Sequence, residues 1–184
     1  IVPVLPSHAL RSVLQSASDD WNQEAYVCCA SKGIEEDSLS TMWQVMETEL
    51  SVQSMVKATL LYGPSFALEV ATNKPTAVVI AGDKRAADVA AEAFHGGAFR
   101  TYHSDDVMGV CIGGSLKNVM AIACGVSDGV GLGANARAAL ITRGLAEVTR
   151  LAVALGANPL TMMGGEFLKA VLRELDVHDL KGKK

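Results

Sequence analysis

Short apolar runs alternate with amphipathic segments along the first hundred residues of the chain. Five runs have the length and composition of buried strands, namely Ile1–Leu5, Tyr26–Ala30, Ala58–Tyr62, Thr76–Ala81 and Phe99–His103. Helices are expected between them over His8–Gln15, with Ser7 as N-cap, and over Ser38–Leu50. Asp83 begins another segment in which apolar residues recur at the helical period. This alternation predicts an α/β fold with a parallel sheet.

The pattern changes after residue 104, where strand-like runs end. Two long helices are expected over Asp106–Val126 and Ala134–Leu155, the second ending at Gly156 as C-cap. Residues 1–103 and 104–184 are therefore predicted to form two parts, an α/β part followed by an all-α part.

Composition narrows the class of protein. The 184 residues are 49% hydrophobic and carry a net charge of −4, which suits a folded core and argues against a nucleic-acid binder. No run reaches the roughly 18 apolar residues of a membrane span, so none is expected. The four cysteines and four histidines lack metal-ligand spacing, which predicts no metal site and buried, reduced thiols.

The sharpest chemical signal is Lys117, followed by Asn118, in an otherwise apolar helical segment. A lysine there loses hydration, and buried ionisable groups concentrate at functional sites. The alternative is a lysine that extends from the helix edge into solvent. Asp128 lies eleven residues further on and would share the face of Lys117 if the helix continued that far.

Two loops follow expected strands at the edge where open α/β sheets bind ligands. Lys32, in Ser31-Lys32-Gly33, is placed to meet an anion or a cofactor, with an ordinary exposed loop lysine as the alternative. Gly63-Pro64-Ser65 follows the third expected strand, and Ser65 either caps a helix or bonds a ligand hydroxyl. No G-x-G-x-x-G follows a strand, since Gly129–Gly133 comes after a helix.

Several separate motifs, in order, resemble the bacterial NAD(P)-dependent glycerol-3-phosphate dehydrogenases. They are Pro6-Ser7-His8, Ser31-Lys32-Gly33-Ile34-Glu35, Gly63-Pro64-Ser65-Phe66-Ala67, Leu116-Lys117-Asn118-Val119 and the run from Ser127 to Gly144. The resemblance covers about residues 1–164. It implies a Rossmann-type domain, a helical domain and an active site between them. It also implies hydride transfer between NAD(P)H and dihydroxyacetone phosphate, giving sn-glycerol 3-phosphate.

The resemblance assigns roles to individual residues. Lys117 matches the catalytic general acid/base, and Asn118 matches the residue beside it. Lys32 matches a lysine that contacts both substrate and cofactor. The remaining matches are Gly63 and Ser65 as substrate-binding positions, and Ala67 and Pro6 as cofactor-binding positions. The implied cofactor is NAD, with NADP as an alternative, and the implied partners are a small phosphorylated substrate and a second copy in a cytoplasmic homodimer. A plastid or glycosome is left open as the compartment.

The sequence departs from the family at both ends. The family's glycine-rich turn lies upstream of Ile1–Leu5, and after Met163-Gly164 the family's phosphate-binding Ser-Arg-Asn motif is replaced by Gly165-Glu166-Phe167. We therefore expect either a truncated, internally deleted product or a partial gene model, and we expect the chain to bind NADH weakly or not at all. The alternatives are a non-catalytic remnant that serves as a binding or oligomerisation module, and a 3-hydroxy-acid dehydrogenase, which the Gly63 and Lys117 motifs disfavour.

Overall fold

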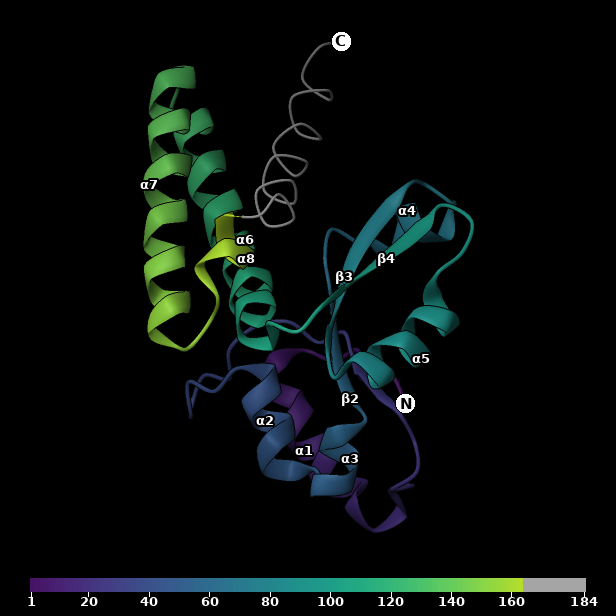
Figure 1. Cartoon of the computed structure of the whole chain (residues 1–184). Helices are drawn as coiled ribbons and strands as arrows, with labels where there is room; N and C mark the ends of the chain where they lie inside the picture. The colour runs from purple at the N-terminus through teal and green to yellow at the C-terminus, as the bar shows by residue number, and fades with distance from the viewer. Residues whose placement is uncertain (164–184) are drawn as a thin grey trace.

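The computed structural model describes residues 1–163, apart from the side chains of Asp19 and Met163 (Figure 1). Four strands form one sheet in the order β1-β2-β3-β4. They are β1 (Val27–Cys29), β2 (Ala58–Tyr62), β3 (Thr76–Gly82) and β4 (Phe99–Ser104). β1 pairs with β2, and β3 with β4, in parallel. The α/β class predicted for this part is confirmed.

The sheet is mixed, so the expected wholly parallel arrangement is wrong for one pair. β2 and β3 are antiparallel, with Tyr62 opposite Val79. The connection between them contains only the five-residue helix α4 (Ala67–Ala71) and returns the chain directly beside β2. The two parallel pairs are joined by longer helical crossovers, as parallel pairing requires.

The segment Ile1–Leu5 lies along β1 without forming a regular strand. The N–H groups of Cys28 and Ala30 donate to the carbonyls of Ile1 and Pro3, each over 2.9 Å. Pro3 has no N–H, so it cannot donate the return bond that a ladder needs at that position. The predicted edge position is therefore occupied, but the predicted strand is not regular.

Helices cover both faces of the sheet. α1 (Ser7–Ser16), the short 3-10 turn η1 (Ser18–Asp20), α2 (Met42–Glu49) and α3 (Val52–Val56) lie on one side, and α5 (Lys84–Phe94) lies on the other (Figure 1). Leu10, Met46 and Leu60 belong to the core on the first side, and Val78, Ile80 and Ala87 to the core on the second. β1, β2 and most of β3 are thus enclosed between two apolar layers, whereas β4 has no buried residue.

The helix starts agree with the sequence prediction at Asp83 and differ from it at two other positions. Asp83 caps α5 by accepting from two backbone N–H groups, as predicted. The expected N-cap Ser7 is wrong, because Pro6 occupies that position and Ser7 is already helical. The helix expected from Ser38 begins only at Met42, since Leu39 has a left-handed backbone (φ 55°) and Thr41 forms the capping box.

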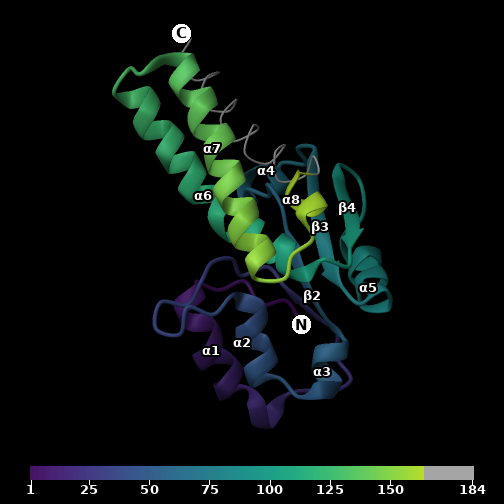
Figure 2. The ribbon, with the colours of Figure 1, turned by 60° about the vertical axis from the view of Figure 1, so that its left-hand side comes forward.

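The second part is helical, as predicted. α6 (Val107–Gly129) and α7 (Gly133–Ala154) lie side by side and extend away from the sheet, and α8 (Pro159–Met163) returns toward it (Figure 2). Gly144 of α7 sits against Met120 of α6, where an added Cβ would lie 2.2 Å from the Met120 Cε. Ile112, Val148 and Ala152 belong to the core between these helices.

Within the described residues, α6 is long and apolar enough to span a membrane by composition alone, with a mean hydropathy of 1.6 over its best window. Of that window, 44% is buried inside the fold. Its N-terminal half packs against β2 and α2, and its later half packs against α7. The buried part of α6 is thus held by contacts with the sheet, α2 and α7.

Candidate functional site

The ends of β1 and β2 bring the predicted loop residues together. The Lys32 ammonium donates to the Gly63 carbonyl over 3.0 Å and lies 5.9 Å from the centre of the Tyr62 ring. The Ser65 hydroxyl donates to the same carbonyl over 3.4 Å, and it does not cap α4. Because β1 and β2 are parallel neighbours, their carboxyl ends share one edge of the sheet. Lys32, Gly63 and Ser65 thus meet at the predicted edge.

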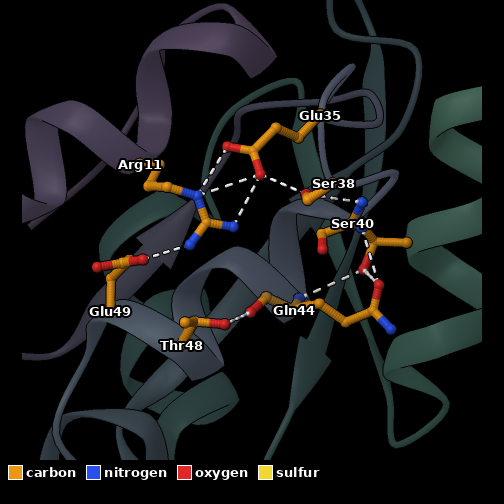
Figure 3. A network of polar contacts seen from close by, with 8 residues as sticks. Arg11, Glu35, Ser38, Ser40, Gln44, Thr48 and Glu49 are labelled. Carbon is orange, nitrogen blue, oxygen red and sulfur yellow. Dashed lines mark hydrogen bonds and ion pairs between the residues drawn. The ribbon is translucent and has the colours of Figure 1, made fainter.

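A charged network holds the far end of the Lys32 loop (Figure 3). The Arg11 guanidinium from α1 binds both oxygens of Glu35, with Nε and Nη2 at 2.8–3.1 Å, and also donates to Glu49 on α2. The Ser38 hydroxyl donates to Glu35 as well. The hydrogen bonds from Arg11, followed by the one from Ser38, lower the pKa of Glu35 to about 2. Glu35 is therefore a fixed carboxylate that ties the loop to two helices.

Three further hydrogen bonds fix the start of this loop. The Ser31 carbonyl accepts from the Tyr62 hydroxyl over 2.6 Å, and the Ser31 hydroxyl accepts from the Leu5 N–H over 2.7 Å. The Gly33 carbonyl accepts from Ser115 on α6 over 3.1 Å. The loop that carries Lys32 is consequently held by the N-terminal segment, by β2 and by the helical part.

Lys117 lies on α6 and is 7% exposed. This burial agrees with the loss of hydration expected for a lysine in an apolar helical segment, and it disagrees with a side chain extended into solvent. Ser115 and Gly114, two and three residues earlier on the same helix, contact the Lys32 loop and the Tyr62 ring. Lys117 therefore lies about one helical turn beyond the contacts that join α6 to the sheet. The catalytic role of Lys117 stays a prediction.

Other predicted site residues lie nearby but at the surface. Asn118 is exposed on α6, and Ala67 and Pro6 are exposed at the starts of α4 and α1. α6 does continue as far as Asp128, which shares its helix with Lys117. Asp128 lies about 16 Å further along the axis and forms an ion pair with Arg137 on α7 at 3.2 Å.

Sequence reasoning missed the residues that hold the site from a distance: Arg11, Glu49, Tyr62 and Ser115. Their partners are 24 to 82 positions away, so no local spacing marks them. Glu35 lies in one of the motifs that resemble the family, but nothing in that motif predicts its ion pair with Arg11. The complementary charges of Arg11 and Glu35 were a weak signal available in the sequence.

The described residues do not fit a whole dinucleotide cofactor. A pyrophosphate needs a glycine-rich turn between a strand and a helix. The glycine-rich turn here joins α6 to α7, with Gly131 and Gly133 at positive φ, and lies in the helical part. No described group of three His, Cys, Asp or Glu side chains could hold a metal ion. The four cysteines are buried and free.

Comparison with known proteins agrees with this geometry. Family models described as the N-terminus and the C-terminus of NAD-dependent glycerol-3-phosphate dehydrogenase match residues 1–88 and 106–168. Curated relatives named glycerol-3-phosphate dehydrogenase [NAD(P)+] include those of Anaeromyxobacter dehalogenans, 52% identical, and Myxococcus xanthus, 48% identical, each over 89% of this chain. The crystal structure of glycerol-3-phosphate dehydrogenase from Coxiella burnetii has a TM-score of 0.81 at 41% identity, and the match covers 89% of this chain and 50% of that one.

The chain spans about half the length of the curated relatives it matches, 50% and 49% of the two named above. The two family models follow one another in the order of the fold, the first over β1, β2, β3 and the start of α5, and the second over α6 to α8. Lys32, Gly63 and Lys117 fall inside these matches. Lys32 and Gly63 lie at the sheet edge, and Lys117 is buried on α6, the helix that contacts this edge. The chain belongs to the NAD-dependent glycerol-3-phosphate dehydrogenase family.

Proposed function

We propose that this chain carries the substrate-side residues of a glycerol-3-phosphate dehydrogenase, which interconverts dihydroxyacetone phosphate and sn-glycerol 3-phosphate with NAD(P)H. The observation that carries the proposal is the burial of Lys117 on α6, one turn beyond the contacts of that helix with the Lys32 loop. A buried lysine and a lysine at a strand end, carried by two elements that contact each other through Ser115 and Gly33, suit a small anionic substrate.

The residue types suit reduction of a ketone. A bound nicotinamide cofactor would supply the hydride, and hydride addition to the ketone would build negative charge on its C2 oxygen. The Lys117 ammonium stabilises that charge and donates one proton to the oxygen, which gives the alcohol. The neutral amine then takes a proton from solvent.

Lys32 has a different role in this proposal. Its hydrogen bond to the Gly63 carbonyl holds the ammonium at the edge of the sheet. There it attracts the phosphorylated substrate and contacts the cofactor, with Gly63 and Ser65 as further substrate contacts. Asn118 is proposed only as a neighbour of the catalytic lysine. Ala67 and Pro6 are proposed only as neighbours of the cofactor.

A second candidate function is a non-catalytic oligomerisation module. One observation favours it: α6 exposes Val119, Ile122 and Val126, spaced as one stripe along the helix. A stripe of this kind suits a homodimer contact in either function, and a cytoplasmic homodimer is the assembly we propose. Light scattering during gel filtration, with Ile122→Glu as the disrupting variant, measures whether the stripe holds two copies together.

The test of catalysis uses a chimera in which this chain replaces the matching segment of the Anaeromyxobacter relative. Oxidation of NADH with dihydroxyacetone phosphate is measured for the chimera and for the 184-residue chain. Lys117→Ala is expected to lower kcat by about 10²–10⁴, with little change in the KM for NADH. Lys117→Arg keeps the positive charge, but an arginine guanidinium hardly gives up a proton. Substrate binding is therefore expected to be recovered relative to Lys117→Ala, whereas turnover is not.

Lys32→Ala is expected to raise the KM for both substrate and cofactor. Lys84→Ala is the matched control, because Lys84 is an exposed lysine that follows the carboxyl end of antiparallel β3, at the opposite edge of the sheet. Near wild-type kcat in the Lys117→Ala chimera would show that this lysine is structural. A folded chimera without turnover would favour the non-catalytic module.

A further inference from the structure

Tyr62 is the last residue of β2 and is 2% exposed. It lies directly before Gly63 and between the sheet and the helical part. Burial raises the pKa of its phenol well above the usual value, so the hydroxyl stays protonated and available as a donor. A buried tyrosine hydroxyl usually has a hydrogen-bond partner, and the partner of Tyr62 belongs to the Lys32 loop.

One side of Tyr62 faces the Lys32 loop. The hydroxyl donates to the carbonyl of Ser31, the residue before Lys32, over 2.6 Å. The Lys32 ammonium lies over the ring, 5.9 Å from its centre, within the range of a cation–π contact. The same side chain therefore fixes the backbone before Lys32 and supports its ammonium.

The other side of Tyr62 faces α6. A Cβ added to Gly114 would lie 2.2 Å from the Tyr62 Cδ2, so the helix backbone rests directly on the ring. The Cys111 sulfur, one turn earlier, lies 3.8 Å from the Tyr62 hydroxyl. Lys117 follows Gly114 by three residues, about one turn. The ring thus sets how closely the helix that carries Lys117 approaches the sheet.

We propose that Tyr62 is a positioning residue that sets the spacing between Lys32 and Lys117, an inference that rests on the proposed function of these two lysines. The aromatic ring supports one ammonium on its face and the helix of the other at its edge. Gly114 is its required partner, because any larger residue there would push the ring and the helix apart.

The first experiment needs no catalysis. The lysines of the 184-residue chain are reductively methylated with a ¹³C label, which preserves their charge, and Lys32→Arg assigns the Lys32 signal. The aromatic ring is expected to shift that signal upfield. Tyr62→Leu is expected to abolish the shift, and Tyr62→Phe, which keeps the ring, is expected to retain most of it.

Gly114→Ala is expected to move the same Lys32 signal, although it changes a residue on another element. Gly125→Ala is the matched control, since Gly125 lies on the same helix with no atom within 4 Å of an added Cβ. In the Tyr62→Leu background Gly114→Ala is expected to add nothing, because the two changes act through one contact. A Lys32 signal that is insensitive to both Tyr62→Leu and Gly114→Ala would overturn the proposal.

The second experiment measures catalysis in the chimera. Loss of one hydrogen bond in Tyr62→Phe is expected to raise the KM for dihydroxyacetone phosphate by about 2- to 10-fold, with kcat little changed. Gly114→Ala is expected to lower kcat by about 2- to 10-fold as well, whereas Gly125→Ala is expected to change neither kcat nor KM. A purely structural Tyr62 would alter stability without this split. If the wild-type chimera lacks activity, the proposed function fails. The NMR signal of Lys32 in the 184-residue chain still shows whether Tyr62 holds that lysine.

Discussion

Substitution of Gly63 by alanine should loosen the sheet and the site together. An added Cβ would lie 2.8 Å from the Ala77 carbonyl oxygen and 2.8 Å from the Val78 Cα. Both atoms belong to the backbone of β3, which cannot move aside without weakening its pairing with β2. The Gly63 carbonyl is also the acceptor for Lys32, so its displacement moves the ammonium.

The size of the effect follows from this contact. Overpacking of a close-packed site costs about 1–3 kcal/mol. For a chain of this size each kcal/mol lowers the melting temperature by about 2–4 °C, so Gly63→Ala is expected to lower it by about 2–12 °C. In the chimera, the KM for dihydroxyacetone phosphate should rise as well.

Urea unfolding followed by tryptophan fluorescence measures the change, because Trp21 and Trp43 pack against the core around α1 and α2. Gly125→Ala is again the control: it fills open space in a helix and should raise stability by about 0.5–1 kcal/mol. If Gly63→Ala and wild type unfold at the same urea concentration, β3 does not approach Gly63 as closely as described, and the reasoning fails.

Calorimetry of the 184-residue chain should show weak or no NADH binding, because this sequence has no glycine-rich turn between a strand and a helix; tight binding would contradict the expectation. The pKa of Glu35 is lowered from 4.5 to about 2, so its ion pair with Arg11 contributes stability above about pH 4.5 that is lost as the pH falls toward 2. Between pH 4.5 and pH 2, the urea midpoint of Glu35→Gln should therefore fall less than that of the wild type. The same pH dependence in both proteins would count against the ion pair. Burial raises the pKa of Cys28, Cys29 and Cys111, so these thiols should react with an aromatic disulfide reagent only after unfolding. Rapid labelling of the native chain would show that they are accessible.

Local patterns in the sequence determined where most helices and strands lie, and they determined that one site residue, Lys117, is buried. The helix that begins after Asp83 and the two long helices are present because apolar periodicity and capping act over a few neighbouring residues. The burial of Lys117 followed from the same kind of information, since its apolar neighbours on α6 leave a lysine little access to water.

Tertiary structure decided the direction of β3 and the contacts that hold Lys32. The direction of a strand depends on how its connection packs, and a sequence pattern of alternating elements does not specify it. The pairing of Arg11 with Glu35 and of Tyr62 with Gly114 joins residues 24 and 52 positions apart. Such contacts have no local signature, because they form only when the whole fold brings their side chains together.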